Sequence, residues 1–166
     1  FITTSVFWRN ARRYQARTYR HTFWDTGTVL GNLLAVATDA GLPTQTVLGF
    51  VDAEINALLD VDGDREAAIS LVAIGRDDRP APASPAVTPL NLPDPTVNEP
   101  RIEYPEIGAM HRASSLDSPE DVVNWRSAPA IAPPTRPGGA IPLRPLPPDR
   151  APTVTIDQVI EKRRSV

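Results

Sequence analysis

The sequence predicts an α+β fold, of order β-α-α-α-β, over about residues 1–79, followed by a long proline-rich and largely irregular segment. The opening stretch FITTSVFW is rich in β-branched and aromatic residues, which favour a strand. The residues between it and the continuous apolar run AAISLVAIG show helical periodicity. Of the 19 prolines, only Pro43 precedes residue 80. Because each proline removes a backbone donor, we expect few regular elements after that point.

The first predicted helix is ARRYQARTYRH, which Asn10 can cap and which ends near His21. Its residues Arg13, Arg17 and Arg20 fall on one helix face. Three interpretations of these arginines stay open: a solvated helix face, an anion site, or the edge of a cofactor pocket.

Two more helices and a strand are predicted to follow. We expect Asp25 to cap a second helix, whose broad apolar periodicity predicts burial on most sides. Gly41 suits the position after the helix end, and Pro43 prevents continuation. Asp52 is expected to cap a short third helix, AEINALLD, and VDGD then turns the chain into the strand AAISLVAIG.

The acids of this turn, Asp60, Asp62 and Asp64, have the spacing found at the start of a calcium loop. Such a loop needs a glutamate near its twelfth position and a helix after it, whereas this chain continues into a predicted strand. An ordinary acidic turn is therefore predicted. No metal site is expected, because His21 and His111 are isolated from other ligand-type residues.

The later part of the chain is predicted to be a linker followed by one further helix. Residues 80–152 form the proposed proline-rich linker, in which extended conformations dominate. Within it, Ser118, Pro119 and Asp121 have the pattern of a helix start, which predicts a short helix near 118–125. Residues 153–166 are predicted to begin another helical unit. The stretch PLRPLPP also suits an SH3- or WW-like groove, although a rigid spacer needs fewer assumptions.

Composition argues against several classes of protein. The formal net charge is −3 and charges are nearly balanced in both parts, so no nucleic-acid partner is expected. The absence of cysteine excludes disulfides and thiolate metal sites and agrees with a cytoplasmic protein, which we expect. No apolar run predicts a membrane span or a membrane partner. Because the chain opens on Phe1 and stops within a charged run, we expect a piece of a longer polypeptide.

The ordered series of residues over about the first 75 positions resembles the C-terminal half of a nitroreductase-fold FMN module. The most similar subgroup is the SagB-type dehydrogenases, which oxidise azoline rings in peptides. The terminal IEKRRSV resembles the opening helix of such a module, so the resemblance implies the end of one module, a linker, and the start of a second at 153–166. The matching positions in the first part are Arg9, Tyr14, Arg17, Tyr19, Arg20, Asp25, Gly27, Asn32, Gly41 and Leu42.

The resemblance implies an FMN-dependent oxidoreductase, with an azoline dehydrogenase of peptide natural-product biosynthesis as its finer form. It implies a catalytic role for the pair Arg13 and Tyr14. Arg13 stands where the subgroup has lysine, and a guanidinium does not release its proton, so Tyr14 is the only candidate base of the pair. Thr28 stands where the family often has histidine, and Gly31 where it often has glutamine. The implied flavin-binding residues are Arg17, Asn32, Leu48, Gly49, Arg163, Arg164 and Ser165, the last three as a phosphate site.

The partners that this implies are a small-molecule or peptide substrate and a second nitroreductase-like module, in cis or as a homodimer. The departures at Arg13 and Thr28 leave a second hypothesis open. In it, this is a degenerate, non-catalytic module that serves as a scaffold or peptide-docking surface.

Overall fold

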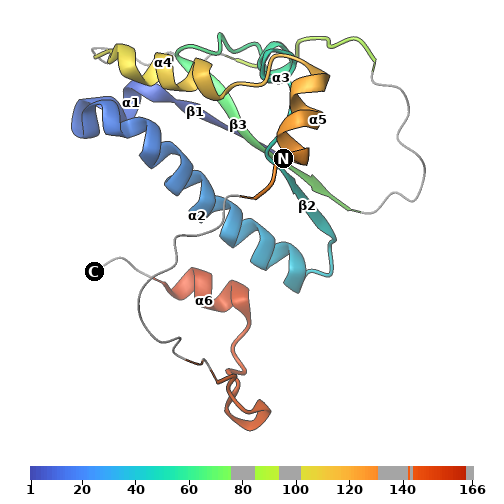
Figure 1. The fold of residues 1–166 in the computed structure, drawn as a ribbon. Helices are drawn as coiled ribbons and strands as arrows, with labels where there is room; N and C mark the ends of the chain where they lie inside the picture. The colour runs from blue at the N-terminus through green and yellow to red at the C-terminus, as the bar shows by residue number, and fades with distance from the viewer. Residues whose placement is uncertain (76–84, 94–101, 131–141, 143, 164–166) are drawn as a thin grey trace.

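A computed structural model describes residues 1–75, 85–93, 102–130, 142 and 144–163 (Figure 1). A three-stranded antiparallel sheet of order β1-β3-β2 lies at its centre, formed by Ile2–Val6, Glu66–Ile74 and Thr44–Val47. The predicted apolar strand is confirmed as β3, the central strand. The predicted order lacks β2, because the four residues TQTV carry little apolar signal of their own.

The helical part after β1 differs from the prediction. Helix α1 (Phe7–Tyr14) begins three residues before Asn10. The prediction that Asn10 caps this helix was therefore wrong. No cap is needed, because the Phe7 N–H donates to the Arg65 carbonyl at 2.9 Å, across the sheet. The predicted single helix is broken at Gln15, where φ is 54°, and a 3-10 turn, η1 (Gln15–Arg17), follows. The break redirects the chain, so that α1 and the next helix pack against each other.

Helix α2 (Thr18–Asp39) is continuous, so the prediction of a helix start at Asp25 was wrong; Asp25 lies in its middle and is exposed. The predicted end is confirmed. Gly41, at φ +68°, donates its N–H to the Thr38 carbonyl, and Leu42 donates to the Ala37 carbonyl. This is the hydrogen-bond pattern of a Schellman motif, and it requires a left-handed residue at Gly41.

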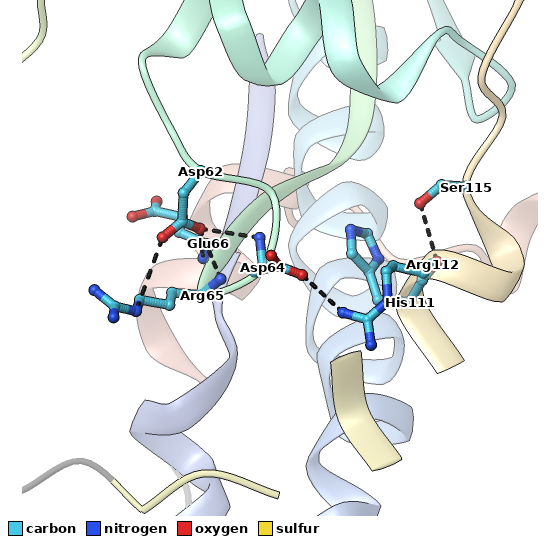
Figure 2. Close-up of polar contacts among 7 residues, drawn as sticks. All are labelled: Asp62, Asp64, Arg65, Glu66, His111, Arg112 and Ser115. Carbon is cyan, nitrogen blue, oxygen red and sulfur yellow. Dashed lines mark hydrogen bonds and ion pairs between the residues drawn. The ribbon is translucent and has the colours of Figure 1, made fainter. Parts of the chain in front are cut away.

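Helix α3 (Asp52–Leu59) begins at Asp52 rather than after it, and the Asp52 carboxylate does not cap it. In the acidic turn that follows, Asp62 Oδ1 accepts hydrogen bonds from the N–H groups of Asp64, Arg65 and Glu66 (Figure 2). Burial pushes the pKa of Asp62 upward, but these three donors outweigh it, so the pKa is lowered. The turn therefore stabilises the entry into β3, as predicted for an ordinary acidic turn.

Two helices follow in the segment 102–130, namely α4 (Pro105–Ser114) and α5 (Pro119–Ser127). The start of α5 is confirmed as predicted: Ser118 Oγ accepts from the Asp121 N–H at 3.1 Å, and Pro119 is the first helical residue. Helix α4 has no counterpart in the sequence prediction. Its Ile107 is buried in the same core as Phe7, Ala11, Ala67 and Ile69.

Polar contacts also tie α4 to the N-terminal part. Figure 2 shows Arg112 reaching Asp64 in the acidic turn, with its Nη1 2.9 Å from Asp64 Oδ1. Because both side chains are exposed, this ion pair adds little stability. The buried Ile107 and His111 instead determine which face of α4 lies against the N-terminal part.

The last described helix is α6 (Ile156–Lys162), which contacts α2 (Figure 1). A helix in this region was predicted, with Ile156, Val159 and Ile160 facing inward. Ile156 and Val159 are exposed and only Ile160 is half-buried, so the predicted burial is wrong for two of the three. The division into domains at residues 79 and 152 stays a prediction.

Candidate functional site

A cavity of about 450 Å³ lies where α2, β3 and the loop after β2 meet helices α4 and α5. Its size is in the range of small-molecule sites, and most of its wall is apolar or aromatic. The segment before residue 75 contributes the greater part, and 102–130 contributes the rest. The lining residues are Tyr19, Phe23, Thr26, Gly27, Leu30, Leu48, Phe50, Asp52, Ala68, Ile69, Ser70, His111, Ser114, Leu116 and Trp125.

Tyr19 brings a phenol to the cavity wall and is held there from both sides. Its ring packs edge-on against Phe7, with centroids 5.9 Å apart, and against Phe23 at 5.0 Å. Its hydroxyl lies 2.5 Å from Ser114 Oγ on α4. Burial raises the pKa of Tyr19, and the Asp52 charge adds to this. Tyr19 is therefore a neutral phenol at physiological pH.

Asp52 is the only charged side chain among the described residues that line this cavity, apart from His111 when protonated. Its Oδ2 accepts from the Leu116 N–H at 2.8 Å, and its own N–H donates to the Leu116 carbonyl at 3.1 Å. This reciprocal pair explains why the carboxylate does not cap α3. Burial raises the pKa of Asp52, although the Leu116 N–H and the nearby His111 oppose the rise.

His111 lies on the inner face of α4 and is only 6% exposed. Its ring centroid is 5.0 Å from that of Phe7 and 6.1 Å from that of Tyr19. Burial lowers the pKa of His111, although Asp52 and Asp64 act in the opposite direction. A lowered pKa keeps the imidazole neutral at pH 7.

Helix α5 closes one end of the cavity over Gly49. A Cβ atom placed on Gly49 would lie 2.7 Å from Trp125 Cε3, so the indole occupies the space that any other residue would need. Arg126 Nη2 donates to the Gly49 carbonyl at 2.7 Å. The close approach of this helix thus depends on glycine at position 49.

Of the residues implied to bind flavin, two lie at this cavity. Leu48 lines it and is 57% exposed, and Gly49 is buried beneath Trp125. Asn32 is exposed on α2 and donates back to the Thr28 carbonyl at 3.2 Å. Arg17 is also exposed. Arg163 is exposed after α6, and Arg164 and Ser165 lie outside the described residues.

The implied catalytic pair lies elsewhere, at the corner between α1 and α2. The Tyr14 ring stacks on His21 with centroids 4.1 Å apart, and the Arg13 guanidinium carbon lies 5.5 Å from the Tyr14 ring centroid. Tyr14 is half-buried, but it is not among the residues that line the 450 Å³ cavity. Arg13, like Arg17 and Arg20, is exposed and forms no ion pair with another described residue.

Sequence reasoning missed the polar residues that the structure brings together, namely Tyr19, Asp52, His111 and Ser114. Tyr19 and Asp52 were noted for other reasons, and His111 was set aside because no ligand-type residue lies near it in sequence. The stretch HRASS, which follows a proline-started helix pattern at Pro105, was the available signal for α4.

The cavity fits the ring of a flavin better than its phosphate. Gly27 lies on the wall, and a Cβ placed there would meet nothing within 4 Å, so the wall is open beside it. Aromatic and aliphatic side chains suit a planar ring. Within the part of the chain that the structure describes, the lining includes no lysine or arginine, and Asp52 would repel an anion. A phosphate group would therefore need cations from outside this cavity.

The Nitroreductase family model matches residues 3–76, which is less than half of the 166-residue chain. The match confirms the family-level resemblance for this part, and the combination of a small antiparallel sheet with helices agrees with a nitroreductase-like fold. The family suggests an oxidoreductase of the FMN type. No curated protein and no solved structure matches the chain.

Within the described residues, no helix combines the length and the apolar character that a membrane span requires. The search of the same residues for clusters of three or more metal-ligating side chains found none.

Proposed function

We propose that this chain is part of an FMN-dependent oxidoreductase, with the oxidation of an azoline ring in a peptide as its finer form. The observation that carries the proposal is the cavity beside Leu48, whose main walls belong to the region matched by the Nitroreductase family model. FMN, when bound, accepts a hydride from a substrate carbon. In this proposal Leu48, Gly27 and Leu30 bound the space for the ring system.

The residues of this chain would orient the substrate and exclude water. Phe23 and Trp125 contribute apolar wall to the cavity, and Tyr19 with Ser114 supplies a fixed polar contact on the same wall. Arg163, Arg164 and Ser165 are proposed to hold a phosphate that belongs to a second nitroreductase-like module, in cis or as a homodimer. Paired guanidiniums and a hydroxyl suit such a dianion.

Proton removal from the substrate is assigned to Tyr14, whose ring lies beside the Arg13 guanidinium. Because Tyr14 is absent from the lining of the described cavity, this role requires a site that the second module completes. The proposal thus separates two phenols: Tyr19 serves the cavity of this chain, and Tyr14 serves a shared one.

The visible spectrum tests the proposal. The purified protein, with FMN added and the excess removed, should keep a yellow chromophore with absorption near that of free flavin. A colourless protein that retains no FMN, alone or with the neighbouring module co-expressed, would refute the proposal. Replacement of Leu48 by Glu should weaken retention, whereas the same change at the exposed Ala53 should not.

The alternative function is a non-catalytic docking module, favoured by arginine at position 13 and by the absence of Tyr14 from the described cavity lining. The variant Tyr14→Phe discriminates between the two functions in a flavin-loaded protein. A large loss of oxidation rate supports catalysis by Tyr14. An unchanged rate supports the docking role for this module.

A further inference from the structure

We propose that the 450 Å³ cavity binds a ligand with a protonated amine or amidine on an aromatic or aliphatic body. The inference concerns ligand binding alone. It rests on the proposed function only where the bound ligand is taken to be the substrate of the oxidation. It follows from the polar groups that the described residues place on the wall, which offer hydrogen-bond acceptors and a negative charge but no cationic donor.

The direction of the Tyr19–Ser114 hydrogen bond is set by the helix. Ser114 Oγ lies 3.0 Å from the carbonyls of both Met110 and His111, one turn back on α4, and donates its single proton there. We therefore assign Ser114 as the acceptor of the Tyr19 hydroxyl proton, 2.5 Å away. With its proton engaged, the Tyr19 oxygen meets the cavity as an acceptor.

Asp52 adds a second acceptor and the negative charge. A carboxylate offers about four acceptor sites, and the Leu116 N–H fills one of them. Because the carboxylate is half-buried, its attraction for a cation is screened less than at the surface. A bound ammonium would also offset the burial that disfavours the ionised form of Asp52.

Among the described residues of the wall, no cationic side chain competes with such a ligand. Their number includes neither lysine nor arginine, and the His111 imidazole is held neutral by burial, so it adds no positive charge. Arg126, which is the neighbour of Trp125, directs its Nη2 to the Gly49 carbonyl instead. An anionic ligand would meet Asp52 with no compensating charge from the other described residues of the wall.

The rest of the wall suits the body of the ligand and its charge. The rings of Tyr19, Phe23, Phe50 and Trp125 belong to the lining. Aromatic faces attract ammonium groups through their quadrupoles, by about 0.5–2 kcal/mol for each well-placed ring. A site that combines aromatic rings with a carboxylate binds cations in preference to neutral molecules of the same shape.

Three probes with the same ring test the inference: benzylammonium, benzyl alcohol and benzoate, with charges of +1, 0 and −1. Dissociation constants are measured at pH 7.5 by NMR titration of the full chain without added flavin. We expect benzylammonium to bind at least about tenfold more tightly than benzyl alcohol, and benzoate not to bind. Equal binding of the three probes, or tighter binding of benzoate, would overturn the inference.

The variant Asp52→Asn locates the effect, because asparagine keeps an oxygen that can accept from Leu116 while removing the charge. This variant should raise the dissociation constant of benzylammonium by about tenfold and leave that of benzyl alcohol unchanged. The matched control is Asp60→Asn at the other end of α3, where φ is 59° and asparagine is well tolerated. An equal loss in both variants would mean that only long-range charge attracts the probe, which contradicts the inference.

If Asp52→Asn unfolds, the indole N–H signals of the wild-type protein decide the location. Trp125 lines the cavity, whereas Trp8 and Trp24 do not. Benzylammonium should shift the Trp125 signal, identified with Trp125→Phe, more than the other two. A shift confined to Trp8 or Trp24 would refute binding in the cavity. If the protein retains no FMN but passes this test, only the proposed function is refuted. If the protein retains FMN but fails this test, only the present inference is refuted.

Discussion

The N-terminal 75 residues and the α4–α5 segment, residues 105–127, contribute to one cavity in different ways. The first region holds the sheet and α2, falls almost wholly within the Nitroreductase family match, and provides most of the apolar wall. The α4–α5 segment lies outside that match, yet it provides His111, Ser114, Leu116 and Trp125. Recognition of a family from one region can therefore leave the chemical groups of a site unassigned.

The two regions also differ in how they are held. The first is joined by strand pairing along β3, which contacts both other strands. The second is attached by a few side-chain contacts: Ile107 in the core, Asp52 with Leu116, Tyr19 with Ser114, and Gly49 beneath Trp125. Each of these contacts can be removed separately, so the dependence of one region on the other can be measured.

The largest effect is expected from Ile107→Ala, which removes the α4 side chain from the shared core. Ile107 is 5% exposed, and such truncations cost about 2–5 kcal/mol of unfolding free energy. Denaturant unfolding measures the loss. The exposed Met110→Ala on the same helix should change stability by less than about 0.5 kcal/mol. Equal effects of the two variants would show that α4 does not share the core of the first region.

The next effect is expected from Gly49→Ala, because the added Cβ would lie 2.7 Å from Trp125 Cε3. The indole must move, at a cost of about 1–3 kcal/mol, and Trp125 should become more exposed to a fluorescence quencher. Gly31→Ala is the matched control. Gly31 is in α2 with nothing within 4 Å of the added atom, so alanine should stabilise by up to about 1 kcal/mol. Destabilisation by both substitutions would contradict the assigned packing of α5.

A smaller effect is expected from Ser118→Ala, which removes the confirmed cap of α5. The Asp121 N–H loses its acceptor, at a cost of about 0.5–2 kcal/mol to the helix. Hydrogen exchange should become faster in α5 and stay unchanged in β3. Ser118→Asp should restore protection, since aspartate caps helices equally well. Faster exchange in β3 as well would mean that the two regions unfold together.

The smallest effect is the pH dependence that arises from His111. Burial lowers its pKa in the folded state below that of the unfolded chain, so the unfolded chain binds more protons between the two values. Its contribution to stability is complete above about pH 6.5 and is lost as the pH falls through the folded pKa. The slope of unfolding free energy between pH 7.5 and 5.5 should be smaller in His111→Gln. The same slope in both proteins would exclude His111 as its source.

Local sequence patterns predicted several elements because each depends on neighbouring residues. The glycine stop of α2 requires a left-handed residue at one position, and the start of α5 needs a serine and a proline in register. The strand β3 is long and continuously apolar. Predictions failed where a distant partner replaced a local signal. The Arg65 carbonyl accepts the first N–H of α1 in place of a capping side chain. The Leu116 N–H donates to the Asp52 carboxylate, which does not cap α3.

The amino-acid sequence by itself determined the family-level resemblance, the central strand β3, and the helix ends that local hydrogen bonds define. These features depend on backbone conformations and apolar periodicity, which a short window of residues contains. Only the tertiary structure decided that Tyr19, Asp52, His111 and Ser114 meet at one cavity. Those residues are up to 95 positions apart, and their contact depends on the burial of Ile107 beside Phe7, which no local pattern specifies.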